Sequence, residues 1–148
     1  MSATGASIVI TPDTGLISSN QTDPEVVSPD GSINWKWAQF MIQWTDIDMG
    51  HAADEGDVYV QTFQEGVWFD IVAFHVDNAQ NGGETFIRMG TIVVPELNVG
   101  NIIRTDGALA DDTCLAGALL GTKYRTKYKE TVGSAPAVRY IVTALLKQ

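Results

Sequence analysis

The sequence is poor in cysteine, in basic residues and in long apolar runs, and each shortage excludes a class of protein. Its single cysteine, Cys114, cannot form an intrachain disulfide, so stability has to come from packing, from oligomerisation or from an ion. No apolar run approaches the roughly 20 residues that cross a bilayer, and the first residues lack the basic and apolar regions of a signal peptide. We therefore expect a soluble protein that has no membrane partner and is not exported by that route.

Basic residues are outnumbered, with 9 Lys and Arg against 18 Asp and Glu and a formal net charge of −9. This balance argues against nucleic acid as a partner, because affinity for phosphates rests on clustered cations. The few cations are unevenly placed: Lys36 is the only one before Arg88, and most of the others lie in the last third. A molecule with two electrically different sides would dock in a fixed orientation on a larger surface. An ordinary solvated strand face is the alternative.

Catalytic and metal-binding signatures are also missing. The chain has no nucleophile-elbow motif, no P-loop, no H-E-x-x-H and no Cys or His grouping with zinc spacing. Asp70 lies beside Trp68 and could act as an acid, but strand alternation places His75 on the opposite face, so the two cannot form a dyad. We predict no enzyme activity, no catalytic residues, no cofactor and no metal site.

One loop, residues 46–57, is rich in acidic side chains and contains His51. Carboxylate oxygens could bind Ca²⁺, yet the spacing does not match the EF-hand pattern and no bidentate Glu occupies the required place. A solvated acidic loop that pairs with basic groups of a partner is the favoured interpretation, and ion binding there stays open.

What is present is the composition of one globular domain: 148 residues, of which 45% are hydrophobic and 18% charged. From residue 38 onward, apolar and polar residues alternate over short runs separated by turn residues, which predicts an all-β fold. The expected architecture is a single antiparallel β-sandwich, jelly-roll-like, with an extended N-terminal arm.

Individual strands are predicted at residues 40–46, 58–63, 68–76 and 84–94, with a short candidate at 101–104. The run 68–76 is apolar on both faces, which is typical of a central strand. Gln64-Glu65-Gly66 predicts a hairpin and Asn81-Gly82-Gly83 a turn. Residues 107–112 are either a loop or a single helical turn.

The last third predicts two further strands. Tyr124, Thr126 and Tyr128 alternate with cations, which gives one aromatic and one cationic face, and the alternation resumes over residues 137–147. The connection at residues 131–136 contains Gly, Ser and Pro, so we expect the two strands to form a β-hairpin.

Residues 1–34 are expected to form the extended arm, and residues 35–148 the sandwich domain. The first segment carries Pro12, Pro24 and Pro29 and only short apolar pieces, so it cannot form a core alone. In this interpretation the arm is ordered against a neighbouring subunit and can be deleted without unfolding the body. A flexible tail, or the first strands of the same sandwich, are the alternatives. Trp35 and Trp37 stand where arm and body meet, either closing the base of the sandwich or anchoring an interface.

Several strand segments together resemble small structural proteins of tailed bacteriophages. The segments are Asp57-Val58-Tyr59-Val60-Gln61-Thr62-Phe63, Gly66-Val67-Trp68-Phe69-Asp70-Ile71, Gly121-Thr122-Lys123-Tyr124-Arg125 and Arg139-Tyr140-Ile141-Val142. The resemblance covers roughly residues 38–147 and its motifs are structural. It implies a capsid decoration, or cement, protein of the virion, assembled in the host cytoplasm. Such a protein binds the major capsid protein on the capsid exterior at junctions between capsomers.

The same resemblance implies a homo-oligomer, with a trimer preferred over a dimer because the local symmetry axes of shells favour those states. The alternatives are a tail or head-fibre component that binds a host glycan, and a free carbohydrate-binding module. The residues predicted for the capsid or subunit interface are Ile8, Val9, Ile10, Trp35, Trp37, Lys123, Arg125, Lys127, Lys129 and Arg139.

Overall fold

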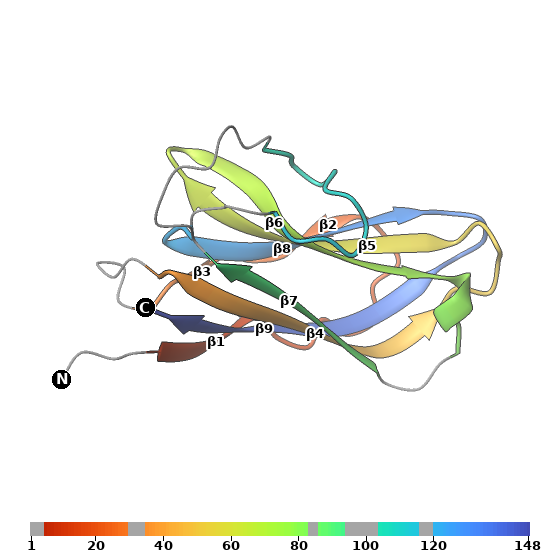
Figure 1. The fold of residues 1–148 in the computed structure, drawn as a ribbon. Helices are drawn as coiled ribbons and strands as arrows, with labels where there is room; N and C mark the ends of the chain where they lie inside the picture. The colour runs from red at the N-terminus through yellow and green to blue at the C-terminus, as the bar shows by residue number, and fades with distance from the viewer. Residues whose placement is uncertain (1–4, 30–34, 83–85, 94–103, 116–119) are drawn as a thin grey trace.

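A computed structural model describes residues 5–29, 35–82, 86–93, 104–115 and 120–148, which form two antiparallel sheets packed face to face (Figure 1). Sheet A has the order β1-β9-β4-β7, with β1 (Gly5–Thr11), β9 (Ala137–Lys147), β4 (Trp37–Asp48) and β7 (Phe86–Val93). Sheet B has the order β2-β8-β5-β6, with β2 (Gln21–Thr22), β8 (Lys123–Thr131), β5 (Glu55–Gln64), β6 (Val67–Asp77) and also β3 (Val26–Val27) on β8. A short 3-10 helix, η1 (Asn78–Gln80), follows β6. The predicted all-β sandwich is confirmed.

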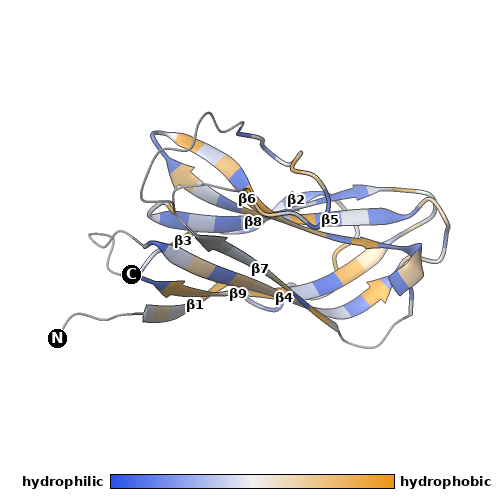
Figure 2. Ribbon diagram, in the orientation of Figure 1, coloured by the Kyte–Doolittle hydropathy of each residue, from blue (hydrophilic) through white to orange (hydrophobic). Residues whose placement is uncertain are grey.

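Alternation along the strands produces the core between the sheets. In β4 every second side chain from Ala38 to Trp44 is fully buried, while the residues between them face outward. The same pattern in β8 separates an aromatic from a cationic face, as predicted, and the aromatic face, with Tyr124 and Tyr128, is the buried one. Hydrophilic and hydrophobic residues accordingly alternate along these strands in Figure 2. Apolar burial from both sheets, at roughly 25 cal/mol per Å², is the main force that holds the layers together.

The predicted hairpin at residues 64–66 is confirmed. Strands β5 and β6 are joined by Glu65 and Gly66, whose φ angles are 52° and 78°. Two successive positive φ angles are typical of the type I′ turn, whose twist matches that of the flanking strands. Gly66 adopts this conformation without the steric cost that a Cβ would add.

The predicted hairpin between the last two strands is wrong. Both strands exist, but β8 pairs with β5 in sheet B and β9 pairs with β1 and β4 in sheet A. The connection therefore crosses from one sheet to the other, and the rings of Tyr128 and Tyr140 meet across the core with centroids 6.3 Å apart. Face-to-face contact buries the aromatic sides of both strands, which edge-to-edge pairing in one sheet would not do.

This crossing is held by the buried carboxylate of Asp54, from the loop after β4. Asp54 accepts hydrogen bonds from the backbone N–H groups of Gly133 (2.7 Å) and Ser134 (2.8 Å), from the Ser134 hydroxyl (2.8 Å) and from His51 N (3.1 Å). Burial alone would raise the pKa of Asp54, but these hydrogen bonds outweigh it and lower the pKa to about 2. Part of the acidic loop is thus an internal anchor.

Acid should destabilise the protein through this anchor. The pKa of Asp54 in the folded state lies below its ordinary value of 3.8, so its contribution to stability is complete above about pH 4 and is lost as the pH falls towards 2. We expect the Tm to fall over this window and to fall less steeply in Asp54→Asn. Thermal unfolding followed by circular dichroism at pH 5 and pH 2.5 measures the effect. Equal pH slopes for the two proteins would contradict it.

The division of the chain at residue 34 is corrected, because residues 5–29 belong to the sandwich. Strand β1 pairs with β9 over most of its length, and β2 and β3 pair with β8. A buried polar network fixes the same segment: Asp23 accepts hydrogen bonds from the hydroxyls of Thr126 (2.5 Å) and Tyr140 (2.8 Å), and Thr11 and Thr126 are joined at 2.5 Å. The alternative prediction, that this segment supplies the first strands of the same sandwich, therefore holds for residues 5–29.

Strand β6 was predicted to be central, but it stands at the edge of sheet B. Residues 104–115, here called the strap, cross the outer face of sheet B and then pair with the edge of β6 at Val72 and Cys114 (Figure 1). Backbone hydrogen bonds join the strap to β6, from Asp70 N to Thr105 O (2.8 Å), from Ala73 N to Thr113 O (2.9 Å) and from Leu115 N to Ile71 O (2.8 Å). Residues 107–112, left open between loop and helical turn, are a loop within the strap.

A β-bulge in β6 changes which residues share a face. Val60 pairs with Val72 and Gln61 with Asp70, so Ile71 is an extra residue in the ladder. Asp70 and His75 consequently lie on the same outer face, contrary to the alternation argument. They still form no dyad, because the Tyr59–Ala73 pair lies between them.

Candidate functional site

The strap is fastened to sheet B by the fully buried carboxylate of Asp70. Its two oxygens accept hydrogen bonds from Gln61 Nε2 (2.9 Å), Thr105 Oγ1 (2.7 Å) and the backbone N–H groups of Gly107 (2.9 Å), Ala108 (3.0 Å) and Leu109 (3.2 Å). Successive N–H groups that converge on one carboxylate satisfy the buried charge. Asp70 is thus a structural anchor that joins the strap to sheet B.

Most of the predicted interface cations on β8 are engaged by the same strap or by its neighbours. Lys127 Nζ lies 2.8 Å from Asp106 Oδ1, and Lys129 Nζ donates to the carbonyl oxygen of Gly107 (2.8 Å). Arg125 Nε donates to Gln61 Oε1 (2.8 Å). The remaining two pair with the N-terminal segment, Lys123 with Glu25 and Arg139 with Asp13. These five cations therefore form ion pairs or hydrogen bonds with acidic, amide and carbonyl groups of the chain itself.

The predicted aromatic and N-terminal interface residues divide into buried and exposed ones. Ile10 and Trp35 are buried, with Trp35 Nε1 donating to Ser28 Oγ (2.6 Å), so the alternative in which Trp35 closes the base of the sandwich holds. Ile8 is partly buried against the core. Val9 points outward and is 52% exposed, and half-buried Trp37 has Lys147 Nζ 4.8 Å from its ring centroid.

Other outward aromatic rings are also covered by cations. Phe63 and Trp68 stand side by side on sheet B, with ring centroids 5.2 Å apart. Arg125 lies 4.2 Å from the Trp68 centroid and Lys123 lies 5.3 Å from that of Phe63. These cation–π contacts occupy ring faces that a sugar would need for stacking.

The outer face of sheet A is different, because its central side chains carry no charge. We call it the A face, and it consists of Ser7, Val9, Gln39, Met41, Gln43, Ile87, Met89, Thr91, Ile141, Thr143 and Leu145. Cross-strand register places Val9, Thr143, Met41 and Met89 in one row across all four strands. An uncharged surface of this extent is notable in a chain whose net charge is −9.

The A face is rich in apolar side chains and slightly hollowed. Ile87 and Met89 are 53% and 62% exposed. A shallow depression of about 370 Å³ runs over β1, β9 and β4, lined by Val9, Met41, Thr143 and Leu145 among others. Among the described residues of sheet A, the outward charged side chains stand at the two ends of this face, with Lys147 at one and Asp46, Asp48 and Arg139 at the other. A charge-free centre with a charged rim is the usual anatomy of a protein interface.

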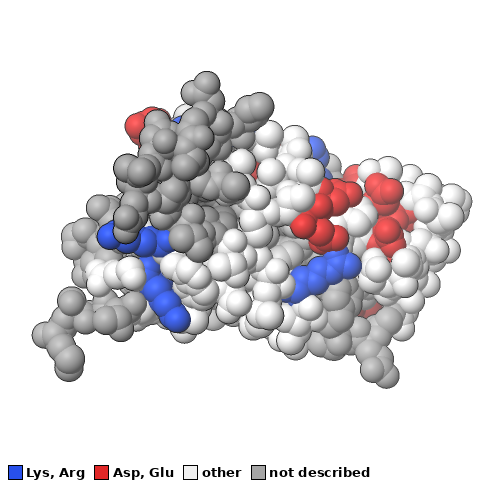
Figure 3. Space-filling view, viewed as in Figure 1, with Lys and Arg blue, Asp and Glu red and all other residues white. Residues whose placement is uncertain are grey.

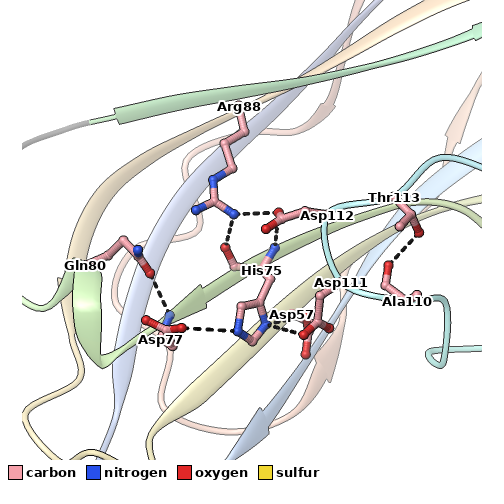
Figure 4. A network of polar contacts seen from close by, with 9 residues as sticks. All are labelled: Asp57, His75, Asp77, Gln80, Arg88, Ala110, Asp111, Asp112 and Thr113. Carbon is pink, nitrogen blue, oxygen red and sulfur yellow. Dashed lines mark hydrogen bonds and ion pairs between the residues drawn. The ribbon is translucent and has the colours of Figure 1, made fainter.

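A second group of side chains, the His75 cluster, lies where the strap meets β5 and β6. It consists of His75, Asp57, Asp77 and Asp111 (Figure 4). In the space-filling view, acidic side chains gather over this end of the sheet beside a basic one (Figure 3). Asp57, His75 and Asp111 each offer one ligand atom, and these atoms lie within 4.8 Å of one another, so they could hold a metal ion.

The electrostatics of the cluster reflect its excess of carboxylates. Burial raises the pKa of Asp57 to about 6, and Asp111 adds to the effect although His75 opposes it. Burial acts to lower the pKa of His75, but Asp57, Asp111 and Asp77 outweigh it and raise that pKa above its ordinary value. Both raised pKa values mean that Asp57 and His75 hold a proton more readily than they would in water.

Sequence reasoning missed both the A face and the His75 cluster. In each strand, alternation separated the residues of the A face from those of the opposite face. That these residues together form one uncharged surface becomes apparent only from the strand order β1-β9-β4-β7. The cluster joins residues 57, 75 and 111, whose spacing matches no metal-binding motif.

Compared with models of known protein families and with curated proteins, the sequence matches none of them. Within the described part of the chain, no helix has the length and apolarity that a membrane span requires.

Proposed function

We propose that the protein is a bacteriophage capsid decoration protein that attaches to the outer capsid surface through the A face. The observation that carries this proposal is the uncharged, apolar-rich centre of a four-stranded sheet on a strongly acidic chain. Such a face is poorly suited to water and well suited to burial against another protein. The sequence resemblance to phage structural proteins supplies the class of partner, the major capsid protein.

The chemistry of the A face restricts its partner to another protein surface. Nucleic acid and anionic lipid are both recognised by cations, and the centre of this face has none. The partner surface should itself be uncharged, because a charge buried opposite Met41 or Thr143 would be left without a counter-ion. A capsid exterior that offers many identical copies of such a surface is stabilised by many modest contacts.

The proposed protein is a homo-oligomer at the junctions between capsomers, and a trimer is preferred over a dimer. The alternative, a tail or head-fibre component that binds a glycan, or a free carbohydrate-binding module, lacks a supporting observation, since cations lie over the rings of Trp37, Phe63 and Trp68. No enzyme activity is proposed.

A charge placed at the centre of the A face should abolish attachment. Thr143 lies between Val9 and Met41 on the neighbouring strands, so Thr143→Glu would bury a carboxylate in the interface. We expect the affinity for capsid shells assembled from the same phage's coat protein to fall by about 100-fold or more. Cosedimentation of the purified full-length chain with such shells measures it.

Thr122→Glu is the matched control, because Thr122 is exposed and lies outside the A face, before β8. It makes the same chemical change and should bind like the wild type. Equal affinity of both variants would remove the A face from the proposal. Copy number per virion tests the class of protein separately: hundreds of copies fit a decoration protein, whereas a handful would indicate a tail component.

A further inference from the structure

The His75 cluster brings together three ligand atoms from segments that are far apart in the sequence. Asp57 on β5 and His75 on β6 are direct cross-strand partners, and Asp111 lies at a turn of the strap. His75 Nδ1 is 2.8 Å from Asp57 Oδ1 and 3.4 Å from Asp111 Oδ2. Because two of the three donors are on paired strands, their positions are set by the sheet rather than by a loop.

The imidazole ring of His75 directs Nδ1 at the two carboxylates that complete the set of donors. Nδ1 lies at hydrogen-bond distance from Asp57 Oδ1 (2.8 Å), whereas Nε2 lies 3.7 Å from Asp77 Oδ2 (Figure 4). Because a carboxylate accepts, the hydrogen on Nδ1 joins the imidazole to Asp57 when no metal is bound. A metal ion would replace this proton and would be shared by Nδ1 and the oxygens of Asp57 and Asp111.

The charges of the four side chains also favour a cation. The carboxylates of Asp57, Asp77 and Asp111 lie around one imidazole, so acidic groups outnumber basic ones within the cluster. The nearby guanidinium of Arg88 donates to Asp112 and to the backbone carbonyl oxygen of His75.

We propose that Asp57, His75 and Asp111 bind a divalent transition-metal ion, of which Zn²⁺ is the type, and that the ion cross-links the strap to β5 and β6. An imidazole nitrogen in the donor set favours Zn²⁺ and its neighbours over Ca²⁺ and Mg²⁺, which prefer oxygen alone. Donors of a tetrahedral Zn²⁺ site lie about 3.3 Å apart. Asp111 Oδ2 already lies 3.4 Å from Nδ1, and Asp57 Oδ1, at 2.8 Å, would move outward when the metal replaces the proton. Asp111 is 58% exposed, which leaves the remaining coordination position open to water.

The site is distinct from the A face and does not rest on the proposed function. Its structural effect is on the strap, which Asp70 fastens near one end and the ion would fasten near Asp111. Metal binding would thus add coordinate bonds to a segment otherwise held by hydrogen bonds and ion pairs.

The test is a titration of the chelator-treated, full-length protein with Zn²⁺ in competition with a chromogenic chelator. We expect one equivalent of Zn²⁺ to bind, a rise in Tm on binding, and an affinity at least 10-fold lower in His75→Gln and in Asp111→Asn. His51→Gln is the matched control, since His51 is the other histidine of the chain and is exposed in a loop; it should bind like the wild type.

Asp111→Asn keeps the test decisive if His75→Gln fails to fold, because Asp111 is largely exposed. Absence of saturable binding up to millimolar Zn²⁺ would show that a proton, and no metal, balances the cluster, and would overturn the proposal. Unchanged affinity in Asp111→Asn would overturn it as well, and so would tighter binding of Ca²⁺ than of Zn²⁺.

Discussion

Removal of residues 1–29 is expected to abolish cooperative folding. The deletion takes away β1, which covers one side of β9, together with the buried side chain of Ile10. It also removes Asp23 and Thr11, the partners of the Thr126 and Tyr140 hydroxyls. Each buried polar group left unsatisfied costs about 1 to 3 kcal/mol, and lost apolar burial adds about 2 kcal/mol for Ile10 alone. Together these losses are comparable to the total free energy of unfolding of a domain, about 5 to 15 kcal/mol.

Thermal unfolding followed by near-UV and far-UV circular dichroism gives the result, with deletion of residues 1–4 as the control. The short deletion should unfold cooperatively near the wild-type Tm, whereas the long deletion should show no sharp transition. If the long deletion unfolds cooperatively within a few degrees of the wild-type Tm, the N-terminal segment is a separate arm, as the sequence predicted.

Asp70→Ala should have the largest effect of any single substitution proposed for this chain. We expect the free energy of unfolding to fall by about 3 to 5 kcal/mol, because several buried donors lose their only common acceptor. The backbone amides of Gly107, Ala108 and Leu109 should then exchange with solvent faster than those of β5, because the strap loosens before the sheets separate.

Urea denaturation gives the stability change, and hydrogen exchange resolved by residue gives the location. Asp48→Ala serves as the control, because Asp48 is exposed at the end of β4 and its loss should change stability by less than about 0.5 kcal/mol. If Asp70→Ala behaves like Asp48→Ala, Asp70 does not anchor the strap. If stability falls but strap exchange is unaltered, the loss has another cause.

Local features of this fold were predictable from the sequence. Alternation separated the two faces of β8 and β9 correctly, and those of β4 as far as Trp44, because the period of a regular strand depends only on its own backbone. It failed at Asp46, which was grouped with Trp44 but is exposed beyond a shift in the strand register. Gly66, next to Glu65, marked the β5–β6 turn for a similarly local reason, namely the need for positive φ.

Pairing between distant segments could not be predicted in the same way. Alternation decides which side of a strand is buried but not which strand lies beside it, so the crossing between β8 and β9 was mistaken for a hairpin. The bulge at Ile71 left no mark in the sequence, yet it placed Asp70 and His75 on one face. The cations of β8 suggested an external partner because their acceptors, Asp106 and Gly107, belong to the strap. The candidate strand at 101–104 lies mostly outside the described residues.

The crossing between β8 and β9 also bears on the order of folding during synthesis. Strand β9 lies between β1 and β4, and β8 lies between β5 and the short strands β2 and β3, so these two strands are interior to their sheets although they follow the others in sequence. Because synthesis proceeds from the N-terminus, β1 has no partner strand until β9 emerges from the ribosome. The pairs β5–β6 and β4–β7 can form earlier, but their sheets keep unpaired edges until β8 and β9 have been made.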